Sequence, residues 1–261
     1  MNAATKVTAT DWIVPTWSVP MPGVCALSTT RNGGVSAGAY AALDGSGGFN
    51  LGKNVGDLPD AVAQNRSRLN QYLPAPAQFL NQVHGNSVLN ASDLRDVKNV
   101  DDADAMITAQ AQTVCAVQTA DCLPVLFCDR QGRVVGAAHA GWRGLAAGIL
   151  EATVAQMRAQ GADEIFAWMG PAIGAQQFEV GSDVRQVFSL KFDTATRFFV
   201  EKSTPGKYLA DIYGLARATL QRVGVDGITG GEYCTVSDAK RFYSYRRDRI
   251  TGRMASLIWI A

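Results

Sequence analysis

The chain has 261 residues and a net charge of +1 at pH 7, and only 18% of its residues are charged. A balance so close to neutral excludes an extended field that would draw the protein toward nucleic acid or an anionic membrane. It fits a small neutral or locally anionic substrate. Hydrophobic residues make up 47% of the chain, which indicates a large buried core. No run approaches the roughly twenty apolar residues of a membrane span.

The N-terminal segment and the cysteines point to the compartment. The first fifteen residues lack the apolar segment of a secretory signal. The five cysteines are odd in number, which favours free thiols in a reducing compartment over a disulfide framework. We therefore expect a cytoplasmic protein that is monomeric or self-associates weakly.

Short strands and helices are predicted along the whole chain. The pattern first predicts a strand at 24–28, turns over the glycine-rich segment 31–56 with Asn32-Gly33 as a hairpin turn, and a helix at 60–73. Strands follow at 105–108, 114–118, 125–127 and 134–138, then a helix at 144–160 and a strand at 165–169. Helix signals at 182–190 and 212–223 precede a final strand at 255–260.

The spacing of these elements indicates the fold class. About four strands follow one another between residues 103 and 140 without a helix, which favours antiparallel or mixed sheets over a purely parallel one. No linker or shift in composition marks a second domain. We expect an α+β fold with mixed sheets, with residues 1–261 forming a single domain.

The two histidines of the chain are candidate metal ligands. His84 lies between an apolar segment and a glycine, and His139 follows a predicted strand and precedes the glycine-rich segment AGWRG. Both lie where a strand gives way to a loop, and functional residues are often held on a rigid scaffold at such points. Either histidine alone is equally well explained as a structural residue.

A third candidate ligand is Cys122, in the sequence TADCLP between two apolar strands. Cys115 and Cys128 are embedded in apolar runs and are typical of core residues. Two imidazoles and one thiolate form a donor set that suits zinc. Three protein ligands leave a fourth position for water or substrate, as in catalytic zinc sites. The spacing matches no zinc-finger pattern, because the ligands come from separate segments.

Six segments resemble those of the laccase-domain (YfiH-like) family, whose members have been called polyphenol oxidases, purine nucleoside phosphorylases and peptidoglycan editing factors. The segments are NQVHGNSV, ADAMIT, VQTADCLPVLFCD, VGAAHAGWRG, GPAIG and YSYRRDRITGR. The resemblance spans nearly the whole chain and implies an α/β/β/α layered fold with zinc held by His84, Cys122 and His139. One departure is AQQFEV after GPAIG, where the family often has a proline and an aromatic residue before Glu-Val.

The resemblance implies phosphorolysis of adenosine, inosine and methylthioadenosine, and deamination of adenosine. For deamination, zinc lowers the pKa of its bound water toward 7, and the hydroxide can attack C6 of the purine. Zinc deaminases of nucleobases also use a glutamate, and none adjoins either histidine here. Asp121, beside Cys122, is expected either to act in acid/base catalysis or to cap a turn.

Phosphorolysis also needs an anion site. The segment after His139 leads into a predicted helix, whose first N–H groups could hold phosphate. Arg143 would add a bidentate contact, and Arg31 is the other residue expected to bind substrate. Alternatively, the glycines only permit a tight turn and Trp142 packs against the core.

Three other functions are alternatives to this one. Multicopper phenol oxidation needs about ten histidines, and the chain has two. A cysteine hydrolase that edits peptidoglycan precursors would use Cys122 as nucleophile and His139 as base. A structural zinc clip is the third alternative.

An arginine-rich segment and an aspartate cluster suggest nucleic-acid binding and cation binding, but simpler explanations are favoured for both. Residues 241–253 contain five arginines among aromatic residues, a pattern typical of nucleic-acid binding. The rest of the chain has no matching basic surface, so an anionic-substrate rim or a solvated strand face is favoured. Asp101, Asp102 and Asp104 are expected to form a turn rather than a site for a hard cation.

Overall fold

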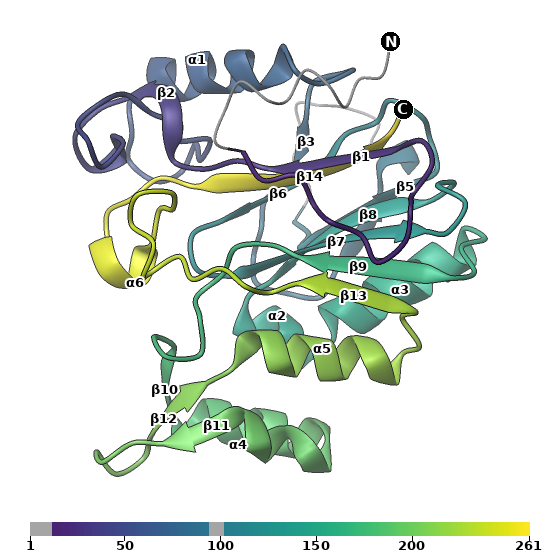
Figure 1. The fold of residues 1–261 in the computed structure, drawn as a ribbon, viewed down its shortest axis with the longest axis vertical. Coiled ribbons are helices and arrows are strands. Elements are labelled where there is room, and N and C mark those ends of the chain that lie inside the picture. The colour runs from purple at the N-terminus through teal and green to yellow at the C-terminus, as the bar shows by residue number, and fades with distance from the viewer. Residues whose placement is uncertain (1–11, 94–101) are drawn as a thin grey trace.

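Two β-sheets pack face to face between helices (Figure 1). The structure is a computed structural model that describes residues 12–93 and 102–261. One sheet has the strand order β1 (Val24–Ser28), β14 (Met254–Ile260), β6 (Cys115–Thr119), β3 (Gln78–Phe79). The other has the order β13 (Gly227–Gly230), β9 (Ile165–Met169), β7 (Leu123–Asp129), β8 (Val135–Ala140), β5 (Ala105–Thr108), β4 (Val88–Asn90). Both contain antiparallel and parallel pairs, so the predicted α+β fold with mixed sheets is confirmed.

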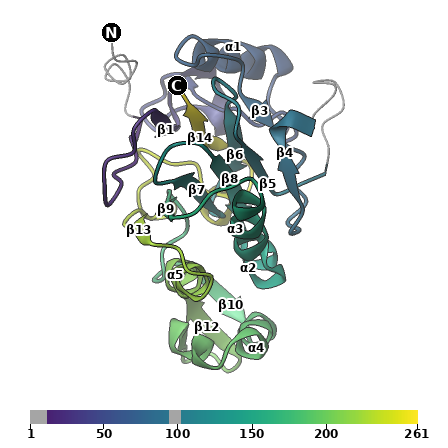
Figure 2. The same ribbon diagram turned by 90° about the vertical axis from the view of Figure 1, so that its right-hand side faces the viewer.

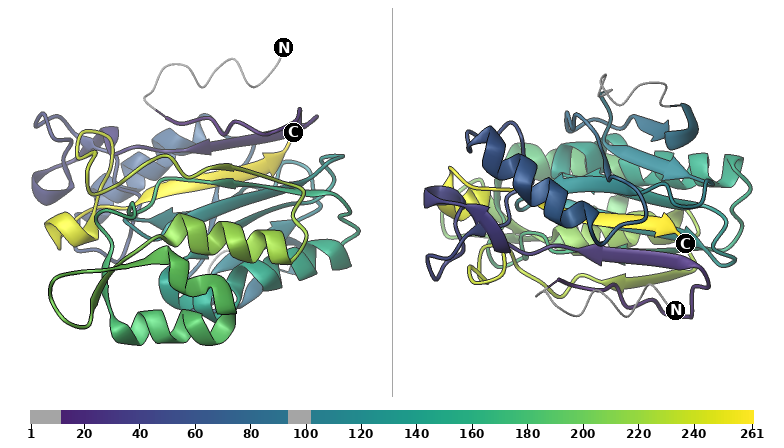
Figure 3. Two further views of the ribbon diagram at one scale, coloured as in Figure 1. Left: turned by 60° about the horizontal axis from the view of Figure 1, so that its bottom comes forward. Right: turned by 90° about the horizontal axis from the view of Figure 1, so that it is seen from above.

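Helices complete the four layers. Helix α1 (Pro59–Asn70) lies over the outer face of the β1-containing sheet, as the view from above also shows (Figure 3). Its Leu69 packs in one cluster with Ala116 and Leu257 of that sheet. Helices α3 (Ile149–Ala159) and α5 (Ile212–Arg222) cover the outer face of the other sheet. The order helix, sheet, sheet, helix agrees with the layered sandwich that the family resemblance implies.

Strand β7 shows why the central elements form as they do. Side chains of a strand point alternately to its two faces. Val125 and Phe127 face the cluster shared with α3 and α5, whereas Leu126 and Cys128 face the cluster between the two sheets. Because both faces are buried, the strand is apolar at nearly every position instead of alternating with polar residues.

A smaller lobe extends from one end of the sandwich (Figure 2). It contains the antiparallel strands β10 (Glu179–Gly181), β12 (Lys207–Ala210) and β11 (Phe199–Glu201) together with helix α4 (Ser182–Lys191). The helix was predicted almost at its observed bounds. The three-stranded sheet was not predicted, because its strands are only three or four residues long.

Two predicted elements are wrong in detail. The helix predicted at 144–160 is two helices, α2 (Trp142–Ala147) and α3, because Gly148 has a φ of 97° and ends the first. Such a left-handed conformation favours glycine. The Asn32-Gly33 pair begins strand β2 (Asn32–Ser36) and does not form the tip of a hairpin.

No helix within residues 12–93 and 102–261 is long and apolar enough to cross a lipid bilayer. All five cysteines carry free thiols, as the odd count suggested.

Candidate active site

Strand pairing brings the three candidate ligands together. Cys122 immediately precedes β7, and His139 lies in β8. In the antiparallel register of these strands Leu123 pairs with Ala140 and Pro124 with His139, so the two ligands share one end of the hairpin. His84 comes from the loop between β3 and β4. The ligands therefore come from both the central strands and a separate loop.

The donor atoms of the three side chains all lie within 4.8 Å of one another. The Cys122 Sγ is 3.8 Å from His84 Nε2, and the two imidazole rings meet edge to face with centroids 4.8 Å apart. Tetrahedral zinc with ordinary bond lengths holds its nitrogen and sulfur ligands about 3.3–3.6 Å apart. The observed spacing is slightly wider than that, and the group is suited to hold a metal ion.

Gly141 leaves room for this arrangement. A Cβ on Gly141 would lie 3.0 Å from both Cys122 Sγ and His84 Cδ2, and 3.6 Å from His139 Nε2. A side chain there would press on the three ligands. This close approach explains why the residue two positions after His139 is a glycine.

Asp104 orients both histidines. Its Oδ1 lies 2.8 Å from His139 Nδ1, which leaves Nε2 of that ring free to bind a metal. The same carboxylate accepts hydrogen bonds from the backbone N–H groups of His84 at 2.9 Å and of Gly85 at 2.6 Å. Asp104 is fully buried. Of the acidic residues expected to form a turn, this one instead supports the ligands; Asp101 lies outside the described residues.

The backbone is strained at two points of the site. His84 has a φ of 63° and Asp121 a φ of 88°, in the left-handed region that residues other than glycine seldom adopt. Such conformations cost about 1–3 kcal/mol each and are concentrated at functional sites. Here they turn the chain so that His84 and Cys122 face each other.

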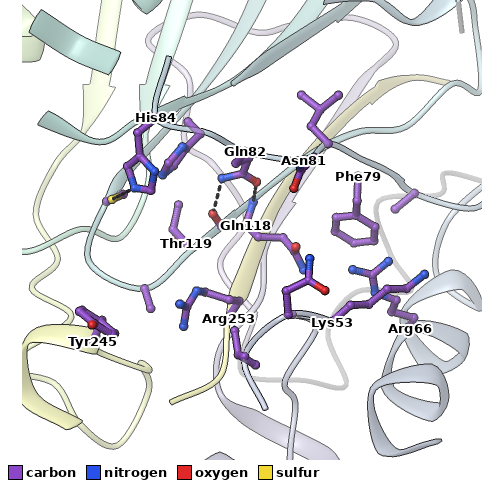
Figure 4. A pocket seen from close by; sticks show the side chains of 18 of the residues that line it. Lys53, Arg66, Phe79, Asn81, Gln82, His84, Gln118, Thr119, Tyr245 and Arg253 are labelled. Atoms are coloured by element: carbon purple, nitrogen blue, oxygen red, sulfur yellow. Dashed lines mark hydrogen bonds between the residues drawn. The ribbon is translucent and has the colours of Figure 1, made fainter. Parts of the chain in front are cut away.

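The ligands face into a pocket of about 730 Å³ (Figure 4). Its described lining includes three cations, Lys53, Arg66 and Arg253, and no carboxylate. Figure 4 places His84 on one side of the pocket, Arg66 with Phe79 on the other, and Arg253 between them. The pocket is therefore complementary to an anionic group. It is also large enough for a drug-sized molecule.

Comparison with known proteins settles the family. A family model described as "Multi-copper polyphenol oxidoreductase laccase" matches residues 25–261. The chain is 50% identical over 250 residues to purine nucleoside phosphorylase YfiH of Escherichia coli, covering 95% of this chain and 98% of that one. It is 49% identical over 249 residues to purine nucleoside phosphorylase PA4543 of Pseudomonas aeruginosa, with the same coverage. The chain belongs to the laccase-domain (YfiH-like) family.

Solved structures of laccase-domain proteins have the same fold. The crystal structure of Neisseria meningitidis protein NMB0706 matches with a TM-score of 0.88 at 48% identity, covering 96% of this chain and 99% of that one. YlmD from Geobacillus stearothermophilus matches with a TM-score of 0.83 at 32% identity, covering 93% and 94%. Although the family description names several coppers, both histidines of this laccase-domain chain are used in one three-residue group.

Both carboxylate oxygens of Asp121 accept hydrogen bonds from groups outside the three ligands. Its Oδ1 accepts a hydrogen bond from the Thr235 hydroxyl and its Oδ2 accepts one from the backbone N–H of Arg246, both at 2.6 Å. These bonds join the Cys122 loop to the start of helix α6 (Tyr245–Asp248). The contacts favour the alternative in which Asp121 caps a turn.

Replacing Asp121 by alanine is expected to lower the free energy of unfolding by about 1–3 kcal/mol, because the Arg246 N–H and the Thr235 hydroxyl lose their partner. Metal content should stay at the level of the unmodified protein. Urea denaturation and metal analysis would check this. Unchanged stability together with lost turnover of Asp121→Asn would instead indicate acid/base catalysis.

Neither arginine predicted to bind substrate lines the pocket. Arg31 is buried and donates to the backbone oxygens of Ala41 and Ala239. Arg143 is exposed, and its guanidinium lies 4.5 Å from the Trp142 ring centroid. Helix α2 is also only six residues long. The guanidinium groups that line the pocket are instead those of Arg66 and Arg253, which folding brings in from distant segments.

Without a metal, the two histidines favour the thiolate form of Cys122. Burial raises the pKa of the Cys122 thiol, but the charge of His139 and hydrogen bonds from both histidines outweigh it and lower this pKa to about 6. Burial lowers the pKa of His139, but the charge of Cys122 and the hydrogen bond with Asp104 outweigh this effect. The pKa of His139 is therefore raised above its usual value. In contrast, burial raises the pKa values of Cys115 and Cys128.

Iodoacetamide is therefore expected to alkylate Cys122 of the metal-free protein at pH 7, whereas Cys115 and Cys128 stay unmodified. The rate at Cys122 should decline as the pH falls through about 6, because the reactive thiolate is then protonated. Peptide mass spectrometry across a pH series would measure this. A rate that keeps rising from pH 7 to pH 9 would contradict the lowered pKa.

Proposed function

We propose that the protein is a zinc-dependent purine nucleoside phosphorylase acting on adenosine, inosine and methylthioadenosine, with adenosine deamination as a second activity. The observation that carries the proposal is the His-Cys-His group, which opens into a pocket lined by cations. Among the described residues, the pocket lining includes no carboxylate. The names of the relatives from Escherichia coli and Pseudomonas aeruginosa support the same reaction.

His84, Cys122 and His139 would hold the metal, because their donor set is that of a catalytic zinc site. Zinc, when bound, supplies a Lewis acid that polarises an oxygen of the reacting groups or lowers the pKa of a water. Asp104 keeps Nδ1 of His139 occupied, so that Nε2 faces the metal position. Metal analysis after purification without chelators tests this assignment.

The pocket cations are suited to hold the phosphate. Arg253 is fixed by donating through Nη1 to the carbonyls of Thr251 and Gly252, and Arg66 donates through Nε and Nη2 to Leu51. In phosphorolysis a phosphate oxygen bonds to C1′ of the ribose while the bond from C1′ to the purine nitrogen breaks. The electron pair leaves on the base, which takes up a proton. Guanidinium groups would hold the phosphate beside C1′.

The reaction is tested by incubating inosine with and without phosphate and separating the products. Hypoxanthine and ribose 1-phosphate should form only when phosphate is present, and adenosine should also yield inosine. Product formation equal to that of a Cys122→Ala control would rule the proposal out.

A cysteine hydrolase remains the second candidate because of the contact between Cys122 and the two histidines. The lowered pKa of Cys122 and the raised pKa of His139 are those expected of a nucleophile and its base. Such an enzyme would cleave amide bonds, as in editing of peptidoglycan precursors. It predicts full activity in metal-free protein, which the zinc enzyme does not.

A further inference from the structure

Tyr245 is an exposed aromatic residue that the proposed reaction has not yet used. Its residue surface is 50% exposed, and it lines the pocket on the same side as His84 (Figure 4). It is one of two aromatic residues in the described lining, and the face of the other, Phe79, is covered by the Arg66 guanidinium at 4.1 Å. The Arg249 guanidinium lies farther from the Tyr245 ring, at 5.9 Å from its centroid. Tyr245 is thus the less covered of the two rings, and it lies at the ligand-bearing side of the pocket.

The position of Tyr245 is fixed by the site itself. Helix α6 begins at Tyr245, where the Ser244 hydroxyl accepts a hydrogen bond from the Arg247 N–H. The next residue, Arg246, donates its N–H to Asp121, the neighbour of Cys122. Arg247 donates in turn to the carbonyls of Thr235, Val236 and Phe242. The Asp121 carboxylate therefore links the backbone next to Tyr245 to the backbone next to Cys122.

From this geometry we infer that Tyr245 is the platform on which the purine base of the substrate stacks. The inference rests on the proposed function. A purine has two large apolar faces, and an exposed aromatic ring in the pocket that holds the reacting groups can bury one of them. The proposed function assigns the guanidinium groups of the pocket to the phosphate, which leaves the tyrosine ring for the base. Tyr245 would thus set specificity for the base, and Asp121 would be a positioning residue that keeps the ring at a fixed place relative to Cys122.

Three variants at this position separate stacking from other roles. Tyr245→Phe retains the ring, Tyr245→Leu retains apolar bulk without a ring, and Tyr245→Ala removes both. Base stacking on an aromatic side chain is worth about a 5- to 150-fold change in affinity. We expect KM for inosine to rise by that factor in the alanine variant and substantially in the leucine variant. The phenylalanine variant should stay within about threefold, with kcat little changed throughout.

Direct binding makes the test independent of turnover. Isothermal titration of the zinc-loaded protein should show that Tyr245→Ala weakens the binding of inosine and of hypoxanthine. The affinity for ribose 1-phosphate, which has no base, should be unchanged. Leu190→Ala is a matched control, because Leu190 is 82% exposed on α4 and lines no part of the pocket. Thermal unfolding of each variant verifies that the fold is intact.

The outcomes distinguish this inference from the proposed function. If the protein catalyses phosphorolysis and Tyr245→Ala changes the KM for inosine by less than twofold, the stacking role of Tyr245 is wrong and the proposed reaction still holds. If inosine binding depends on the ring of residue 245 but no phosphorolysis occurs, the proposed reaction is wrong and the stacking role of Tyr245 still holds. An equal loss of inosine and ribose 1-phosphate binding would also contradict base stacking.

Discussion

Replacing Cys122 by alanine is expected to abolish both metal binding and turnover. The side chain supplies the only sulfur of the three-residue group, and two imidazoles alone hold zinc far more weakly than a set that includes a thiolate. Metal content should fall from about one ion per chain to below a tenth of that value. Turnover should fall by at least about a hundredfold. Atomic emission analysis and the phosphorolysis assay would measure the two effects.

Cys234→Ser is the matched control for Cys122→Ala. Cys234 is also partly buried, and its Sγ accepts a hydrogen bond from the Gly174 N–H, but it does not line the pocket. This variant should retain metal and activity. The decisive companion measurement is the unmodified protein after chelation. Activity lost on chelation and restored by zinc supports the metal enzyme, whereas full activity without metal would leave Cys122 as a nucleophile.

Asp104→Asn is expected to weaken metal binding by about 10- to 100-fold. The amide nitrogen of asparagine cannot accept a hydrogen bond. In one amide orientation His139 Nδ1 and the His84 N–H, which share Oδ1, lose their partner, and in the other the Gly85 N–H on Oδ2 loses its partner. Residues that orient metal ligands typically contribute this much to affinity. Competition with a chromophoric chelator would measure the dissociation constant for zinc.

A control for Asp104→Asn must replace an aspartate that is as buried as Asp104 and also accepts hydrogen bonds from backbone N–H groups. Asp129 is 1% exposed and accepts hydrogen bonds from the backbone N–H groups of Arg133 and Val134, at the opposite end of β7 from Cys122. Asp129→Asn should lower the free energy of unfolding by about 1–3 kcal/mol without changing the zinc affinity. Equal zinc affinity in the two variants would mean that Asp104 has no role in orienting the ligands.

The sequence predicted the elements of the sandwich well because burial on both faces produces continuous apolar runs. Strands β1, β5 and β9 were predicted at their observed bounds, since each is an uninterrupted apolar segment between polar turns. The small lobe was missed because its strands have only three or four residues and are partly exposed, which leaves no periodic pattern.

The site could be predicted only where residue type alone carries the chemistry. His84 and His139 stand out because they are the two histidines of the chain, and Cys122 stands out by its polar setting and the family motif. The structure brings the three together. The sequence predicts a turn at Asp104 because the role of this residue depends on the pairing of β5 with β8, which no local pattern reveals. The same applies to Arg253, which reaches the pocket from a segment more than a hundred residues from any ligand.

The three ligands differ in how firmly the chain holds them. His139 is buried in a central strand and Cys122 adjoins another, whereas His84 is exposed on a loop. Exposed loops open more often than central strands. The residence time of a bound ion is therefore expected to depend on how often the His84 loop lifts away, with the other two ligands remaining as a preformed half-site. Metal exchange would then proceed without unfolding of the core.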